Sequence, residues 1–219
     1  MLKLGLAIPM LWGLPGQCLL GDLLLAVDMG RRGKVYVYTP LAVMPHDRAR
    51  IQVVKDVIRD GVDYLMFVDA DQTIPVGAFG LLMNTMQERK PAVVSGHYYR
   101  RGYPFTSVWS KDTESGMQQC DAKEGIHEID MCGLGCALLD MKWMRENMGP
   151  QPWFEMKPSD EGTIVYDDVT FFNKVRALGG VVLGDARVRC GHLGFPIVVE
   201  DGNVEELRVK EIQEGRPWK

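Results

Sequence analysis

Apolar runs and amphipathic stretches alternate along the first half of the chain. Short runs rich in β-branched and aromatic side chains, such as VYVY before Thr39, predict strands. Longer stretches with apolar residues three or four positions apart, such as Ile51, Val54 and Val57, predict helices. The expected strands are residues 2–8, 34–39, 62–68 and 92–95, and the expected helices are residues 17–29, 47–60 and 75–88.

Glycine and proline residues mark the ends of these elements. Gly61 follows one expected helix, where a left-handed C-terminal cap favours glycine. Pro75 is expected in the first turn of the helix at residues 75–88. The alternation of strands with helices predicts an α/β fold with a mainly parallel sheet of right-handed βαβ units. Because ligands of such sheets lie at the carboxyl ends of the strands, the residues after each strand become site candidates.

The second half of the chain has a different pattern. Residues 96–128 are polar, aromatic and rich in glycine, which predicts irregular structure and a hairpin. Residues 129–139 are apolar around a pair of glycines. Further expected elements are a helix from residue 166 or 167 to 178, a strand at 181–183, and a peripheral helix or partial disorder in the charged tail at 201–219.

Composition narrows the class of protein. With 219 residues and 46% hydrophobic content, the chain can form one sizeable core, so residues 1–200 are expected to form a single domain. A net charge of −4 gives no indication of a general nucleic-acid binder. Five cysteines without a disulfide-framework spacing favour a reducing compartment, so a cytoplasmic location is expected.

The apolar N-terminal region predicts neither a transmembrane helix nor a signal peptide. Pro9, Gly13 and Pro15 interrupt it, and it lacks a basic start and a small-residue cleavage site. A buried strand, a loop and a helix account for it better.

The segment YLMFVDADQTIP places two aspartates at the end of an apolar strand. One aspartate there would be common, because Asp favours tight turns. Asp69 and Asp71, however, are separated by one residue, so an extended chain directs both side chains to the same side. Two carboxylates held close repel each other unless a cation or a proton lies between them. A metal site and a solvated turn are both open at this point.

A second acidic pair begins the helix expected near residue 167. Asp167 and Asp168 could serve only to stabilise the helix N-terminus, worth about 0.3–1 kcal/mol each. Asp168 lies one turn before Phe171 and Phe172, on the predicted inward face, which favours a functional role for one of the pair. His192 lies between glycines in CGHLG, and two carboxylates with one imidazole suit Mn²⁺ or Mg²⁺.

Taken in order, these motifs resemble GT-A-fold glycosyltransferases, especially the small family-2-like enzymes of bacteria and phages. The ordered set spans residues 3 to about 195 and is far more specific than D-x-D alone. It consists of LAIPML, then HDRAR with FVDADQTIP, then IDMCGLGCALLDMKWM with PWF, then DDVTFFNKVRALGG, and last GHLG. The resemblance implies a single Rossmann-like GT-A domain with a smaller antiparallel portion on the acceptor side.

The resemblance also implies a metal and donor site. Asp71 would bind Mn²⁺ or Mg²⁺, His192 would complete the metal site, and Asp69 would contact the ribose or a metal-bound water. The metal would bridge the diphosphate of a nucleotide-sugar donor, with UDP-sugar the expected type. The other donor-binding positions implied are Pro9, Met10, Leu11, Arg48, Arg50, Ala70, Gly133 and Gly135.

Several of these positions have a plainer alternative. Arg48 and Arg50 would face the diphosphate or the sugar, but both also suit a solvated helix start. The glycine pair would let the backbone approach the donor sugar. Trp153 and Phe154 would stack on a sugar ring, or would pack in the core.

For catalysis, Asp168 matches the position of the general base that deprotonates the acceptor hydroxyl in inverting members. The family usually has Glu where this chain has Asp167, which puts the helping role of that residue in doubt. Inversion is therefore favoured only modestly over retention. The acceptor is left open among lipid-linked glycans, cell-wall polymers, proteins and modified nucleobases, and so is homo-oligomerisation.

Two other classes fit part of the pattern. The haloacid-dehalogenase superfamily of phosphatases uses a D-x-D in which Asp69 would be the nucleophile and Asp71 a general acid. That motif normally follows the first strand, whereas two βα units precede it here. The third class is a non-catalytic module that binds sugar nucleotides, against which an intact Asp168 argues mildly.

Overall fold

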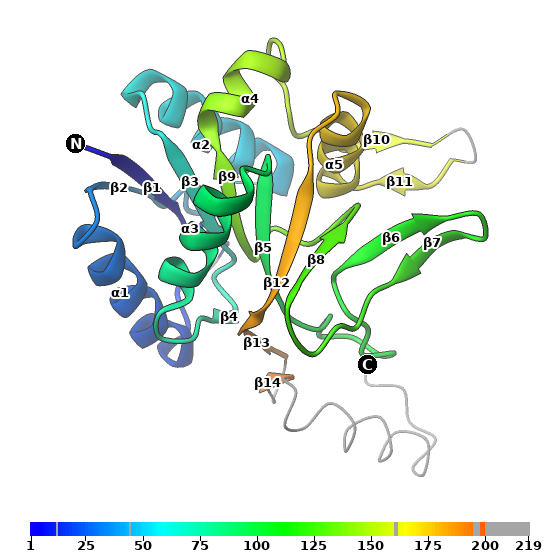
Figure 1. Cartoon of the computed structure of the whole chain (residues 1–219), viewed down its shortest axis with the longest axis horizontal. Coiled ribbons are helices and arrows are strands. Elements are labelled where there is room, and N and C mark those ends of the chain that lie inside the picture. The colour runs from blue at the N-terminus through cyan, green and yellow to red at the C-terminus, as the bar shows by residue number, and fades with distance from the viewer. Residues whose placement is uncertain (12, 44, 160–161, 195–197, 200–219) are drawn as a thin grey trace.

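The computed structural model describes residues 1–11, 13–43, 45–159, 162–194 and 198–199, and the charged tail at 201–219 lies outside them. A seven-stranded sheet forms the centre, in the order β2-β1-β3-β9-β5-β12-β8 (Figure 1). Its strands are β1 (Lys3–Ala7), β2 (Lys34–Tyr38), β3 (Tyr64–Val68), β5 (Val93–His97), β8 (Ile126–Ile129), β9 (Cys136–Asp140) and β12 (Val182–Arg189). The helices are α1 (Gly16–Gly30), α2 (His46–Asp60), α3 (Ala78–Arg89), α4 (Met141–Asn147) and α5 (Asp167–Ala177).

The predicted α/β architecture is confirmed. Strands β2, β1, β3, β5 and β12 run in one direction, with parallel pairing within β2-β1-β3 and within β5-β12. Strand β9 lies antiparallel between β3 and β5, and β8 pairs antiparallel with β12 at the edge. The apolar segment that follows the glycine pair thus forms β9 in the middle of the sheet, a placement that its composition alone could not give.

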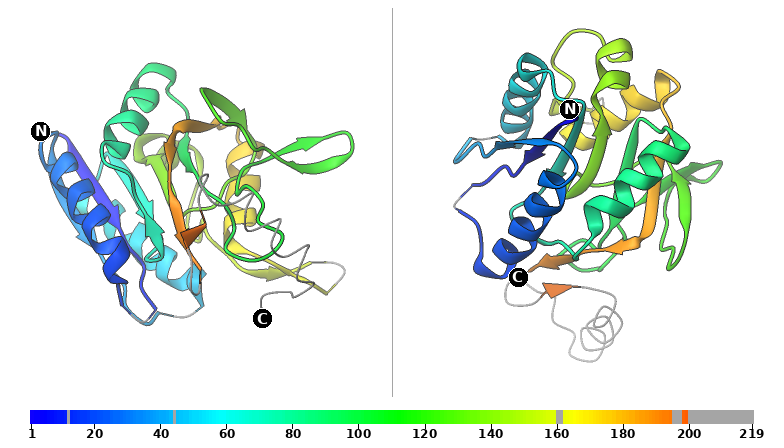
Figure 2. Two further views of the ribbon diagram at one scale, coloured as in Figure 1. Left: turned by 90° about the horizontal axis from the view of Figure 1, so that it is seen from below. Right: turned by 60° about the vertical axis from the view of Figure 1, so that its left-hand side comes forward.

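The alternation of side chains along β3 builds a core on each face of the sheet. Leu65 and Phe67 pack with α2, α4 and α5 on one face. Met66 and Val68 pack with α1 and α3 on the other. Figure 2 shows these two helical layers on opposite sides of the sheet. A continuous apolar strand therefore reflects burial on both faces, as parallel sheets require.

Helix ends agree with the sequence in one case and differ in another. Gly61 adopts the left-handed conformation at the C-terminus of α2, as predicted. Pro75, in contrast, lies outside α3, which begins at Ala78. Gly77 has a φ of 79° and interrupts the helical backbone, while the N–H of Ala78 donates to the carbonyl oxygen of Pro75. A turn therefore precedes the helix.

Smaller antiparallel units surround one end of the sheet. The predicted hairpin between residues 96 and 128 is present as β6 (Ser110–Thr113) and β7 (Gly116–Gln119). A second hairpin comprises β10 (Lys157–Pro158) and β11 (Ile164–Val165). A three-stranded unit comprises β4 (Gln72–Thr73), β13 (Gly191–Leu193) and β14 (Val198–Val199).

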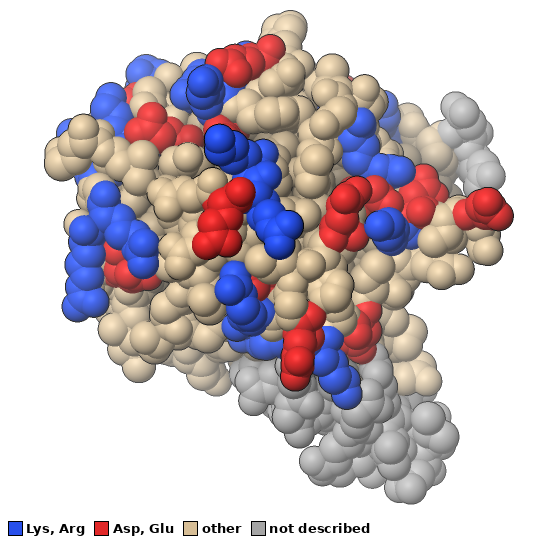
Figure 3. All heavy atoms as spheres, viewed as in Figure 1, with Lys and Arg blue, Asp and Glu red and all other residues tan. Residues whose placement is uncertain are grey.

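Surface charge and helix length bear on the expected partners. On the face seen in Figure 3, acidic and basic side chains are interspersed in small groups rather than gathered into a basic patch. Across the described ranges, every helix is too short or too polar to cross a membrane.

Candidate active site

A cavity of about 540 Å³ opens at the carboxyl ends of β1 and β3. Loop residues after these strands, the first turns of α2 and α5, and strand β13 contribute its walls. The edge of the sheet is the one that the sequence predicted for a ligand. Its lining consists of Pro9, Leu11, Gly13, Pro15, His46, Arg50, Asp69, Ala70, Asp71, Arg101, Tyr166, Asp167, Asp168 and His192.

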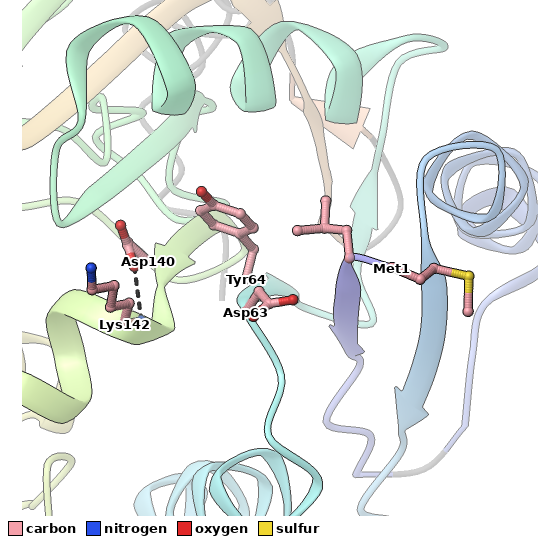
Figure 4. A pocket seen from close by; sticks show the side chains of 6 residues that line it. Met1, Asp63, Tyr64, Asp140 and Lys142 are labelled. Carbon is pink, nitrogen blue, oxygen red and sulfur yellow. Dashed lines mark hydrogen bonds between the residues drawn. The ribbon is translucent and has the colours of Figure 1, made fainter.

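A second cavity, of about 370 Å³, lies at the opposite end of β3 (Figure 4). Its acids already have structural roles. Asp63 accepts a hydrogen bond from the backbone N–H of Lys3 at 2.7 Å. Asp140 caps α4 by accepting from the backbone N–H groups of Lys142 and Trp143. The acids of this cavity are therefore engaged in structural hydrogen bonds, and the first cavity is the candidate site.

Asp71 and His192 are brought together by strand pairing. Gln72 of β4 lies opposite His192 of β13, and the N–H of Leu193 donates to the carbonyl oxygen of Asp71 at 2.7 Å. As a result, Nε2 of His192 lies 3.4 Å from Oδ2 of Asp71. Arg101 also forms an ion pair with Oδ2 of Asp71. Burial raises the pKa of Asp71, but the hydrogen bond and charge of His192 and the charge of Arg101 outweigh it, so the pKa is lowered.

The contacts of His192 test whether this pair fits a cation. Nδ1 of His192 lies 2.8 Å from the carbonyl oxygen of Tyr99, which can only accept, so Nδ1 carries a proton. Nε2 then faces Asp71 as the second N–H of an imidazolium or as a lone pair. A lone pair directed at a carboxylate needs a cation between the two groups. In the lone-pair case, Asp71 and His192 fit a divalent metal, and the Tyr99 carbonyl would orient the ring as a backbone carbonyl commonly does for a histidine ligand.

Asp69 does not complete a three-residue metal site. Over the ranges that the structure describes, no group of three or more His, Cys, Asp or Glu side chains could hold a metal ion. Oδ1 of Asp69 instead lies 3.5 Å from Nη2 of Arg50. Its side chain is 34% exposed in the cavity, where it remains available to another ligand. Of the three predicted metal ligands, the structure brings Asp71 and His192 into contact, and a metal contact of Asp69 stays a prediction.

Arg50 links the two acidic motifs. It projects from α2, and its Nη1 donates to Oδ2 of Asp167 at 2.7 Å. Its side chain is only 12% exposed. Burial lowers the pKa of Arg50, but the charges of Asp69 and Asp167 more than offset this, so the guanidinium stays charged. Arg48 is exposed and does not line the cavity, as the solvated-helix alternative anticipated.

The two acids at the start of α5 differ in environment. Asp167 is buried against Arg50. Asp168 lines the cavity and accepts from the N–H of Val169 at 2.8 Å. Burial raises the pKa of Asp168, Arg50 lowers it, and Asp167 raises it again, with a raised pKa as the result. The N-terminal helix dipole favours the ionised carboxylate, but burial and the neighbouring acid Asp167 have the larger effect on the pKa of Asp168.

The glycine pair serves packing in this structure. Neither Gly133 nor Gly135 lines the cavity. A Cβ on either glycine would come within 3 Å of the Tyr98 hydroxyl. The N–H of Gly135 donates to that hydroxyl at 2.9 Å, and its carbonyl accepts from the N–H of Asp69. Gly135 therefore supports the turn that carries Asp69, and the predicted contact of the two glycines with a donor sugar stays a prediction.

Trp153 and Phe154 belong to the core, so their proposed stacking on a sugar is corrected. Both are almost fully buried, and Phe154 stacks on Phe171 with ring centroids 4.5 Å apart. Met10 lies outside the lining, although its neighbours Pro9 and Leu11 contribute to it. Five lining residues were not among the predicted site residues. These are Gly13 and Pro15 in the loop after β1, His46, which precedes Arg50 by one helical turn, Arg101, and Tyr166, which precedes the acidic pair.

Comparison with solved structures places the fold. The crystal structure of A197 from STIV aligns with a TM-score of 0.60 and 17% identity, over 88% of this chain and 85% of that chain. The crystal structure of GalNAc-T7 with UDP, GalNAc and Mn²⁺ aligns with a TM-score of 0.52 and 11% identity, over 87% of this chain and 44% of that chain. No protein-family model and no curated protein sequence matches the chain. At these identities the similarity establishes a GT-A-like fold and nothing finer.

Proposed function

We propose that this protein is a glycosyltransferase that moves a sugar from a nucleotide-sugar donor, of the UDP-sugar type, to an acceptor hydroxyl. The observation that carries the proposal is one cavity that holds two chemically different sets of groups. Asp71 and His192 lie 3.4 Å apart and would bind a cation, and Asp168 is a half-buried carboxyl group with a raised pKa. A phosphatase would need Asp69 as nucleophile, but Oδ1 of Asp69 faces Arg50. In addition, strand β3, which carries Asp69 at its end, has the antiparallel neighbour β9.

The donor would bind between the loop after β1 and the turn after β3. Pro9 and Leu11 give this part of the cavity an apolar wall suited to a planar base. Asp71 and His192 would hold a divalent ion, Mn²⁺ or Mg²⁺, which would supply positive charge for the diphosphate as the leaving group. Asp69, partly exposed in the cavity, would accept hydrogen bonds from the ribose hydroxyls.

Asp168 would act on the acceptor. A general base must lie within hydrogen-bond reach of the hydroxyl and is most effective when its pKa approaches the working pH. The raised pKa of Asp168 moves it in that direction. The pair of Arg50 and Asp167 would fix the first turn of α5 and so orient Asp168. A base on the acceptor hydroxyl, opposite the leaving group, would give inversion at the sugar.

The proposal is tested with a panel of nucleotide sugars and Mn²⁺. A bound donor at one hundred times its dissociation constant should stabilise the protein by about 2.7 kcal/mol, which thermal unfolding detects. The same mixtures should release free nucleoside diphosphate slowly through hydrolysis of the donor. Binding without any release would favour the non-catalytic module. Neither binding nor release with any donor, at several metal concentrations, would contradict the proposal.

A further inference from the structure

The Asp71 carboxylate already has a cationic partner in the ligand-free protein. Arg101 lies on the irregular segment between β5 and β6, and Nη1 of its guanidinium pairs with Oδ2 of Asp71. The same Oδ2 is the oxygen that faces Nε2 of His192. Arg101 therefore occupies the carboxylate oxygen at which a divalent ion would bind.

The charges of the cavity explain why a cation is needed there. The lining contains four carboxylates and two guanidinium groups. These are Asp69, Asp71, Asp167 and Asp168, with Arg50 and Arg101. The two arginines differ in freedom: Arg50 is buried against Asp167, whereas the side chain of Arg101 is 62% exposed. An ion pair with that exposure contributes at most about 1 kcal/mol, so Arg101 can leave at little cost.

From this arrangement, and resting on the proposed function, we propose that Arg101 is an exchanging ligand of the donor site. In the free protein it neutralises Asp71. When a divalent ion takes that carboxylate, the guanidinium is repelled from Asp71 and turns to the donor diphosphate beside it. Its planar array of N–H donors suits bidentate contact with phosphate oxygens.

The exchange predicts opposite effects on two ligands. Arg101→Ala removes a competitor, so Mn²⁺ alone should bind about two- to fivefold more tightly than to the wild type. The same change removes a charged phosphate contact, so UDP in saturating Mn²⁺ should bind about tenfold more weakly or worse. A residue that merely holds the loop in place would not tighten one ligand while weakening the other.

Isothermal titration calorimetry on the full chain measures both quantities. The titrants are Mn²⁺ alone, UDP with a chelator, and UDP with saturating Mn²⁺. Arg101→Lys keeps a positive charge but loses the bidentate geometry, so its affinities should fall between wild type and Arg101→Ala. Arg100→Ala is the matched control, because Arg100 is adjacent and exposed, does not line the cavity, and is held through its backbone N–H to Thr106.

The outcomes separate the two proposals. In one outcome the wild-type protein binds both Mn²⁺ and UDP, but Arg101→Ala binds Mn²⁺ with unchanged or lower affinity. That result would overturn the exchange and leave the proposed function standing. Unchanged UDP binding in Arg101→Ala would overturn the phosphate contact. A wild type that binds neither Mn²⁺ nor UDP would overturn the proposed function itself. Because Arg101 is exposed, the thermal unfolding midpoint of each variant should lie within a few degrees of that of the wild type.

Discussion

Replacing Arg50 should reveal how strongly the two acidic motifs depend on one cation. In Arg50→Met the apolar stem is kept and the guanidinium is lost. The change leaves the buried Asp167 without its cationic partner. In the 2.7 Å ion pair of Arg50 and Asp167, the two side chains are only 12% and 5% exposed. Removal of one partner of a buried pair costs about 3–5 kcal/mol. The contact with the more exposed Asp69, at 3.5 Å, should add less than about 1 kcal/mol.

A double-mutant cycle separates the loss of the attraction between Arg50 and Asp167 from the cost of leaving the Asp167 charge buried without a partner. Asp167→Asn removes that charge, so Arg50→Met with Asp167→Asn should be less destabilised than the two single changes predict together, by about 2–3 kcal/mol. Urea unfolding followed by tryptophan fluorescence measures each free energy of unfolding. Arg48→Met is the control on the same helix, and because Arg48 is exposed its cost should stay within about 0.5 kcal/mol.

Additive effects in this cycle would refute the coupling of the two motifs through Arg50. The coupling would also be refuted if the free energy of unfolding of Arg50→Met lay within about 1 kcal/mol of that of the wild type. A buried carboxylate that loses its partner should destabilise the protein by more than that.

Two further predictions concern the proposed metal ligands and a buried acid on α1. His192→Ala and Asp71→Ala should each abolish the Mn²⁺ dependence of UDP binding in calorimetry, while the free energy of unfolding without UDP stays near that of the wild type. If both variants kept the metal dependence of the wild type, neither residue would belong to the metal site. Asp22 is buried, neither of its carboxylate oxygens has a hydrogen-bond partner among the residues that the structure describes, and burial raises its pKa from 3.8 to about 7. The folded state thus holds a proton that the unfolded state releases, so stability should fall as the pH rises from about 4 to about 7, by at most about 4 kcal/mol. Asp22→Asn should lack that decline in urea unfolding at several pH values, and an equal decline in both proteins would show that Asp22 is not its source.

The sequence predicts those features of this protein that depend on local pattern. The strand before Asp69, the glycine that closes α2 and the acidic start of α5 follow from hydrophobic spacing and backbone preference. The proximity of Asp71 and His192 does not, because it arises from the pairing of β4 with β13 over more than a hundred residues. The residue types suggested a shared metal site and the resemblance to a family supported it, but neither gives the strand pairing that places the two side chains together.

The errors also have physical causes. A tryptophan and a phenylalanine beside a proline suggest a sugar platform or a core cluster equally well, and only the packing of Phe154 against Phe171 decides between them. Tyr166 is 61% exposed at the rim of the cavity, but an aromatic residue before an acidic pair carries no distinctive signal. Arg101 could not be found because irregular segments have no periodicity from which to infer direction.

The central claim is that Asp168 is the general base of a sugar transfer. Once a donor and an acceptor hydroxyl are identified, Asp168→Asn separates binding from chemistry, since the amide keeps the shape but accepts no proton. The account predicts that donor binding with Mn²⁺ is retained in calorimetry, while the single-turnover rate of transfer falls by roughly 10²–10⁴-fold. Asp167→Asn should cost less in that rate. Transfer by Asp168→Asn at a rate near that of the wild type would contradict the claim.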